Sequence, residues 1–130
     1  MAITEAKEKI KKLIERYEKL SPAQIKNINE MTTRKDFIIP LFEVLGWDVY
    51  NHEQNEVIEE QPAVEGAVDY SFRINNIPQF LLEAKALKVD LEKIEWAQQA
   101  VDYAWNMGVD WVVLTNFENS TLSEPNSNRK

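Results

Sequence analysis

Two apolar segments joined by a tight-turn pair place the strongest constraint on the fold. Apolar and polar residues alternate over 68–74, and the apolar run 78–82 follows directly after Asn75-Asn76. A period of two is typical of a strand with one apolar face, and asparagine tolerates the positive φ of tight turns. The sequence therefore predicts a β-hairpin in the middle of the chain.

Helical periodicity lies on both sides of this hairpin. Apolar residues recur at spacings of three and four over 3–20, with Lys and Glu on the opposite face, which predicts an amphipathic helix. Further helices are expected over 33–45 and 90–107, each ended by the glycine that follows it. Pro40 lacks one helical N–H, so a kink or an irregular first turn is expected there.

Short apolar segments around two tryptophans predict further strands. The period of two returns at Trp47, Val49 and Val57, and 111–114 is typical of a short buried strand. Trp47 and Trp111 are interpreted as core residues. His52 is expected in an exposed loop.

Composition excludes several classes of chemistry. The chain has 130 residues, no cysteine and a single histidine, which excludes disulfides, cysteine-type zinc sites, histidine metal clusters and serine-histidine triads. With no long apolar stretch and no secretory signal, a one-domain cytoplasmic protein that does not use a membrane is expected. The net charge of −7 argues against this domain alone gripping a nucleic acid.

Two opposite charges interrupt the second apolar strand. Glu83 and Lys85 lie two residues apart within 80–87, so they project from the same face of the sheet. Buried charges need a partner or a metal. The simplest partner is a cross-strand ion pair, and Glu-x-Lys alone is a weak signal.

The hairpin adds a third candidate. Antiparallel pairing through Asn75-Asn76 is expected to bring Asp69 near Glu83, so that two carboxylates converge beside Lys85. Such a trio suits Mg²⁺, with the main-chain carbonyl of Ala84 as a further ligand and Mn²⁺ as a substitute. A bound metal would polarise a phosphodiester and activate water, while Lys85 positions that water or stabilises developing charge.

These residues resemble a known nuclease motif. Val68-Asp69-Tyr70 followed by Glu83-Ala84-Lys85 looks like the PD-(D/E)XK motif, with Val68 in place of its proline. The wider resemblance, to the nuclease domains of type I restriction R subunits and type IIG restriction-modification enzymes, covers roughly residues 30–117 and is carried by the segments 32–49, 68–72, 80–87 and 111–117. It implies an α/β fold in αβββαβ order, a mixed central sheet flanked by helices, with an extra N-terminal helix. It also implies Mg²⁺-dependent cleavage of double-stranded DNA.

The resemblance assigns roles to further residues. Gln99 and Tyr103 match a Gln-x-x-x-Tyr motif that positions DNA or the active site, although a core tyrosine and a polar helix edge would have the same spacing. Glu30 is a candidate metal ligand and matches better than Glu43, but either can be a solvated helix residue. Arg34 is a candidate for binding a phosphate or bracing a carboxylate, against the alternative of a surface charge or a salt bridge.

The expected organisation has three parts, namely an N-terminal amphipathic helix with its connector over 1–24, a nuclease core over 25–118 and a flexible polar tail or linker over 119–130. The tail suggests a fragment of a longer protein, with recognition, methylation or translocation on further domains or subunits. Two alternatives stay open, a standalone repair or anti-phage nuclease, and a catalytically idle interaction module of the same fold.

Overall fold

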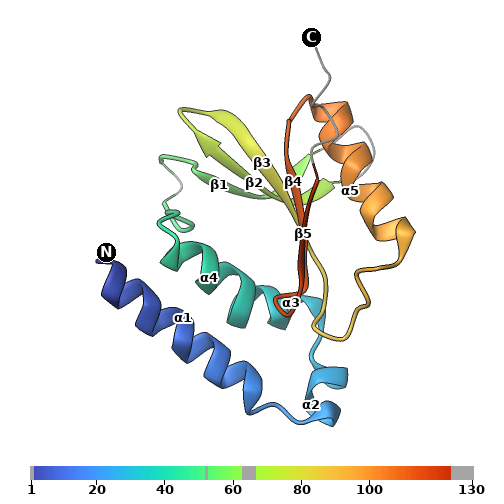
Figure 1. Ribbon diagram of the computed structural model, residues 1–130. Coiled ribbons are helices and arrows are strands. Elements are labelled where there is room, and N and C mark those ends of the chain that lie inside the picture. The colour runs from blue at the N-terminus through green and yellow to red at the C-terminus, as the bar shows by residue number, and fades with distance from the viewer. Residues whose placement is uncertain (1, 52, 63–66, 124–130) are drawn as a thin grey trace.

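A five-stranded mixed sheet forms the centre of the molecule (Figure 1). The computed structural model describes residues 2–51, 53–62 and 67–123. The strands follow one another in chain order across the sheet: β1 (Val57–Pro62), β2 (Ala67–Ile74), β3 (Ile77–Ala84), β4 (Val112–Thr115) and β5 (Ser120–Ser123). Only β3 and β4 run parallel, and the other neighbours are antiparallel. The predicted mixed α/β architecture is confirmed.

The predicted hairpin is β2 and β3. Asn75 and Asn76 connect the two strands with φ values of 51° and 65°, the left-handed region that a two-residue hairpin turn requires. Beside the turn Ile74 pairs with Ile77, and an irregularity between Phe72 and Arg73 then shifts the register by one residue, so that Phe72 pairs with Phe80 and Tyr70 with Leu82.

The second predicted helix is built from three consecutive pieces. These are α3 (Glu30–Thr33), the π-turn η1 (Arg34–Ile38) and α4 (Ile39–Val44). The irregularity expected at Pro40 is confirmed, since the π-turn lies directly before it. Proline has no N–H for the Asp36 carbonyl, and the Arg16 guanidinium donates to that carbonyl instead.

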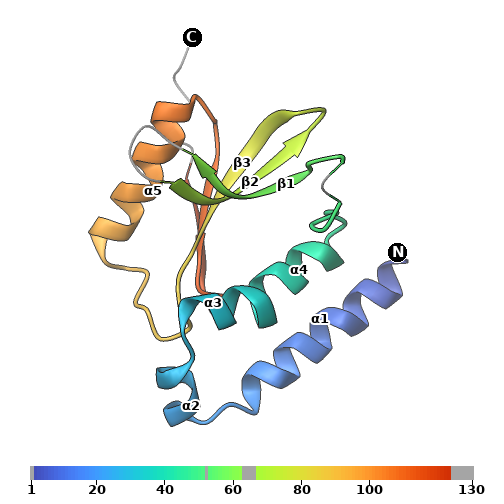
Figure 2. The ribbon, with the colours of Figure 1, turned by 180° about the vertical axis from the view of Figure 1, so that it is seen from behind.

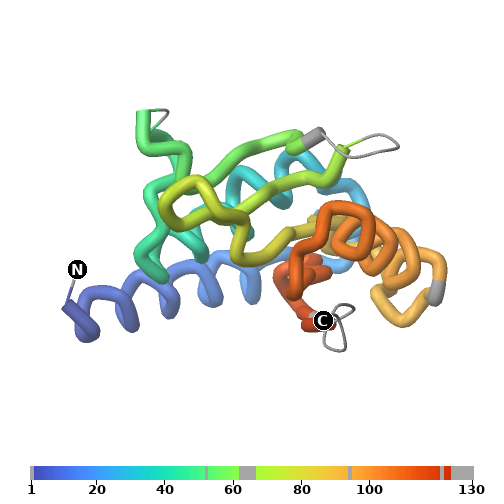
Figure 3. The backbone as a smooth tube through the Cα atoms, turned by 90° about the horizontal axis from the view of Figure 1, so that it is seen from above, coloured from blue at the N-terminus to red at the C-terminus, as the bar shows by residue number. Residues whose placement is uncertain are grey.

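Two α-helical layers cover the sheet. Leu82 and its β4 neighbour Val113 belong to a core that includes Ile38 and Ile39, whereas Leu81 packs in a second core against α5 (Ile94–Met107). Neighbouring residues of a strand point to opposite faces, so the two cores lie on opposite sides. Figure 3, which looks down on the molecule, shows α4 and α5 separated by the strands.

The N-terminal helices form an outer layer. The predicted amphipathic helix is α1 (Ile3–Glu18), and it lies alongside α4 in Figures 1 and 2. Leu13 is its buried residue, and Tyr17 meets Phe37 edge-on with ring centroids 6.4 Å apart. The short α2 (Pro22–Asn27) follows, capped by Ser21. None of the helices in the described ranges is long and apolar enough to cross a membrane.

Several expectations about boundaries were wrong. Residues 47–49 form no strand, and Trp111 precedes β4 with 37% of its surface exposed rather than lying in the core. Trp47, in contrast, packs edge-on against Phe72 as expected of a core residue. The last helix begins at Ile94 instead of Asp90.

The polar tail expected from Asn119 contributes a strand. Ser120–Ser123 form β5, and the flexible tail was wrong for these residues because their backbone pairs with β4 despite the polar side chains. Residues 124–130 and His52 lie outside the described residues.

We predict that Phe72→Ala lowers the free energy of unfolding by about 3–5 kcal/mol, the usual cost of emptying a buried aromatic site. Phe72 is fully buried and stacks on Phe80 with centroids 4.5 Å apart. Urea denaturation measures the loss. Ile74→Ala is the matched control on the same strand, and its half-exposed side chain should cost less than about 1 kcal/mol. Equal losses would contradict the assigned core.

Candidate active site

Three carboxylates form a row across the first three strands. The pairs on either side place Glu60 of β1 opposite Asp69 of β2, and the β2–β3 register continues from Tyr70 and Leu82 to Asp69 and Glu83. Like charges directly opposite one another destabilise a sheet. The row therefore needs compensation by a positive charge or by protonation.

At this row, backbone N–H groups of β2 and β3 donate to side-chain carboxylates of the opposite strand instead of to backbone carbonyls. The Asp69 N–H donates to Glu83 Oε1 over 2.9 Å, and the Ala84 N–H donates to Asp69 Oδ2 over 2.7 Å. Each carboxylate thus accepts a backbone N–H of the opposite strand, just beyond the Tyr70 and Leu82 pair. The predicted approach of Asp69 to Glu83 through the hairpin is confirmed, and both side chains are fixed by backbone donors.

Arg34 supplies the positive charge. Its Nη2 pairs with Asp69 Oδ1 and with Glu30 at 2.8 Å, and its Nη1 pairs with Glu60 at 3.2 Å. The residue is only 5% exposed, and its guanidinium carbon lies 5.5 Å from the centre of the Tyr70 ring. Arg34 is thus a buried, ion-paired residue and not a surface charge, which agrees both with bracing of carboxylates and with the salt-bridge alternative, while its binding to a phosphate stays a prediction.

The helix that carries Arg34 is fastened at its first turn. The Asn29 side chain caps α3 by accepting from the Thr32 N–H, and the buried Thr33 hydroxyl donates to the Asn29 carbonyl. Thr33 Oγ1 also accepts from the Leu87 N–H at 3.3 Å. Because Leu87 follows β3 closely, this bond ties the helical turn before Arg34 to the end of the strand that carries Glu83.

Burial and mutual repulsion change the acidity of the two central carboxyls. Burial, with a further contribution from the negative charge of Asp69, raises the pKa of Glu83 to about 7. Burial also raises the pKa of Asp69, although the Ala84 N–H and the Arg34 charge act in the opposite direction. Glu83 is therefore poised between its charged and neutral forms at neutral pH.

Lys85 lies beside this row without being neutralised by it. Its ammonium is 4.4 Å from the centre of the Trp96 ring on α5. In the part of the chain that the structure describes, no ion pair joins Lys85 to Glu83, although its charge lowers the pKa of Glu83. The simple cross-strand ion pair is therefore not what explains these two charges.

Gln99 and Tyr103 lie elsewhere on α5. They line a hollow of about 500 Å³ together with Gln98 and Asp102, and none of the carboxylates of the row lines it. Trp96 is the α5 residue that reaches Lys85. The positioning role that the resemblance gives to Gln99 and Tyr103 stays a prediction.

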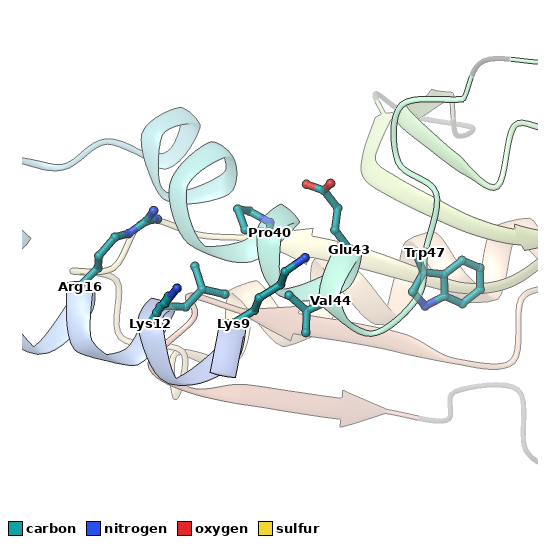
Figure 4. A pocket seen from close by; sticks show the side chains of 8 residues that line it. Lys9, Lys12, Arg16, Pro40, Glu43, Val44 and Trp47 are labelled. Atoms are coloured by element: carbon teal, nitrogen blue, oxygen red, sulfur yellow. The ribbon is translucent and has the colours of Figure 1, made fainter. Parts of the chain in front are cut away.

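The structure separates the two candidate glutamates on the early helices. Glu30 pairs with Arg34 and so joins the row, whereas Glu43 lines a different hollow of about 410 Å³ between α1 and α4 (Figure 4). Lys9, Lys12 and Arg16 of α1 line that hollow with Glu43. The preference for Glu30 over Glu43 thus agrees with the geometry.

Glu60 is the site residue that sequence reasoning missed. It lies on an exposed segment of β1 with a positive φ of 54°, and only the strand register reveals that it faces Asp69. The signal was the acidic pair Glu59-Glu60 after Val57. Without the β1–β2 pairing, nothing in the sequence distinguishes Glu60 from an ordinary surface charge.

The chain is similar to part of a known restriction enzyme. The chain is 31% identical over 129 residues to the type II restriction enzyme and methyltransferase RM.Eco57I of Escherichia coli. The match includes 89% of this chain but 13% of that protein, so the chain is similar to one segment of a much longer enzyme. No protein-family model matches the chain, and no solved structure matches it. The similarity supports a relationship to restriction systems.

We predict that the free energy of unfolding, measured in urea without divalent cations, falls as the pH rises from 4.5 to about 7. The folded chain keeps a proton on Glu83 that the unfolded chain releases, so stability present at low pH is lost through this window. The loss should be about 3 kcal/mol, at about 1.4 kcal/mol per pKa unit. Glu83→Gln should reduce this decline to the part that comes from Asp69, and the exposed Glu59→Gln should leave it whole. An equal decline in Glu83→Gln would contradict the assignment.

Proposed function

We propose that this chain is a Mg²⁺-dependent DNA endonuclease domain of the PD-(D/E)XK type, the cleavage module of a type I or type IIG restriction-modification system. The observation that carries the proposal is the row of carboxylates with Lys85 beside it, at the point where β2 and β3 exchange bonds through Asp69 and Glu83. The similarity of the chain to part of a restriction enzyme that is also a methyltransferase supports a place in a restriction-modification system. Nothing comparable favours a standalone repair or anti-phage nuclease.

The donors of the site suit a hard divalent cation. Asp69 and Glu83 are buried carboxylates, Glu30 is partly exposed, and the guanidinium of Arg34 already lies among them as a positive charge. Ala84 directs its N–H toward Asp69, and since the N–H and C=O of a strand residue point to the same side, its carbonyl faces this side too. Oxygen donors of this kind are those that Mg²⁺ and Mn²⁺ prefer.

The side chains do not yet surround a common cation position. Among the described residues, no three acidic or histidine side chains are arranged to hold a metal. In this arrangement one carboxylate oxygen of Asp69 accepts from Arg34 and the other from the Ala84 N–H. Asp69 and Glu83 would hold the cation, with the Ala84 carbonyl and Glu30 as further ligands.

The proposed reaction divides the work between a cation and Lys85. Asp69 and Glu83 would hold a cation that, when bound, would polarise the scissile phosphate and activate a water molecule. Lys85 holds the attacking water and stabilises the developing negative charge, a role for which an ammonium that is not paired with a carboxylate is suited. Glu83 must lose its proton to bind the cation. Cation binding, and the cleavage that depends on it, are therefore favoured above neutral pH.

The charge of the domain implies help from other parts of a larger assembly. A net charge of −7 repels the phosphates of double-stranded DNA, so binding by this domain alone should be weak and sensitive to salt. Further domains or subunits would supply sequence recognition, methylation or translocation in the cytoplasm. The length of the relative, of which this chain spans 13%, fits that division.

We predict that Lys85→Ala lowers Mg²⁺-dependent cutting of supercoiled plasmid by at least about 100-fold, the usual cost of removing a positioned catalytic group. Lys88→Ala is the matched control, an exposed lysine three residues further on, and should cut as the unchanged protein does. Nicked and linear products are measured on gels at low salt with Mg²⁺, Mn²⁺ or a chelator. Cutting that persists in Lys85→Ala would overturn the assigned site.

The same assay separates the remaining functions. A standalone nuclease acting on ends would degrade linear DNA and spare closed circles. An interaction module would show neither metal-dependent cutting nor metal binding, and Lys85→Ala would then differ from the unchanged protein in stability alone.

A further inference from the structure

Arg34 holds a position that a metal-dependent nuclease would be expected to give to a cation. Its guanidinium touches Glu30, Glu60 and Asp69, which belong to three different elements. Arg34 is 5% exposed, and its Nε has no hydrogen-bond partner. One fixed positive charge thus neutralises carboxylates that would otherwise repel each other.

The contact with Asp69 competes directly with metal binding. The two oxygens of Asp69 are engaged by the Arg34 Nη2 and by the Ala84 N–H. A divalent cation at Asp69 would stand close to the guanidinium, and two positive charges at such a distance repel each other strongly in a site shielded from water. Binding of the cation is therefore favoured when Arg34 leaves Asp69.

Arg34 has ion-pair partners besides Asp69. Its Nη1 is anchored by Glu60 and its Nη2 by Glu30, whose side chains are 57% and 41% exposed. These anchors lie toward the surface, whereas the Asp69 side chain is 12% exposed. The guanidinium can therefore move outward without losing all of its partners.

We propose that Arg34 is an internal counter-cation that occupies the carboxylate row in the metal-free domain and is displaced from Asp69 when a divalent cation binds. Arg34 is then a positioning residue. It keeps the row assembled before the metal arrives, and it lowers the affinity for the metal by the free energy of its own contact with Asp69. The displaced guanidinium stays held by Glu60 and has N–H groups left to donate to a phosphate.

This inference rests on the proposed function, because it assumes that Asp69 and Glu83 bind a divalent cation. It differs from a purely structural role of Arg34 in one measurable respect. A structural brace keeps Asp69 in position for the metal, so its loss weakens metal binding or leaves it unchanged. A competing cation weakens metal binding while it is present, so its loss strengthens it.

The first test measures Mn²⁺ and Mg²⁺ binding to the full chain by calorimetry, without DNA. Arg34→Met should bind at least about tenfold more tightly than the unchanged protein, equivalent to about 1.4 kcal/mol. Lys35→Met is the matched control, since it removes the same charge from the neighbouring residue, whose side chain is 75% exposed. It should change the affinity by less than about twofold.

The outcomes separate the two proposals. If the unchanged protein binds metal and Arg34→Met binds it no more tightly than Lys35→Met, the counter-cation is overturned and the metal site stands. If neither the unchanged protein nor Arg34→Met binds metal, both proposals fail.

A second measurement does not depend on the folding of Arg34→Met. In nitrogen-15-labelled protein, the guanidinium signals of Arg34, assigned with Arg34→Lys, should shift as Mg²⁺ is added and saturate with the affinity found by calorimetry. Arg73, which donates to the Asn76 carbonyl at the hairpin turn, is the internal control and should not shift. Arg34 signals that stay fixed while Mg²⁺ binds would overturn the displacement.

Discussion

The site depends on two hydrogen bonds between β2 and β3, from the Asp69 N–H to the Glu83 carboxylate and from the Ala84 N–H to the Asp69 carboxylate. A carboxylate buried in a sheet is unfavourable unless donors compensate for its lost water. Here the donors are backbone N–H groups of the opposite strand, so each acidic side chain also completes the hydrogen bonding of its neighbour. The chemistry of the site and the cohesion of β2 with β3 are therefore one set of contacts.

The remaining architecture positions charges around these two hydrogen bonds. The sheet brings Glu60 into the row, the first turn of the early helix brings Glu30 and Arg34, and α5 provides the aromatic face of Trp96 for Lys85. Each of these elements is fixed by its own core, on one or the other side of the sheet. A site built in this way is preorganised by packing that lies outside it.

The features that the sequence predicted correctly depend on residues close to one another in the chain. The Asn75-Asn76 turn, the glycine ends of two helices and the irregularity before Pro40 are short-range effects and could be found in the sequence. The turn located the hairpin, but the register that brings Asp69 to Glu83 also needs the shift between Phe72 and Arg73, which no sequence pattern indicated. The ion pairs of Arg34, the role of Glu60 and the strand at Ser120–Ser123 depend on partners distant in sequence, and no single-segment pattern contains that information.

The π-turn η1 has a consequence for how this helix can tolerate change. A π-turn contains one more residue than the α-helical turn it replaces, so it shifts the angular phase of everything that follows. Arg34 at its start faces the carboxylates, while Ile38 and Ile39 at its end face the sheet. Deleting one residue here would restore a regular helix, but the side chains at its two ends would then point in different relative directions. The apolar face could then be kept only by turning Arg34 away from Asp69.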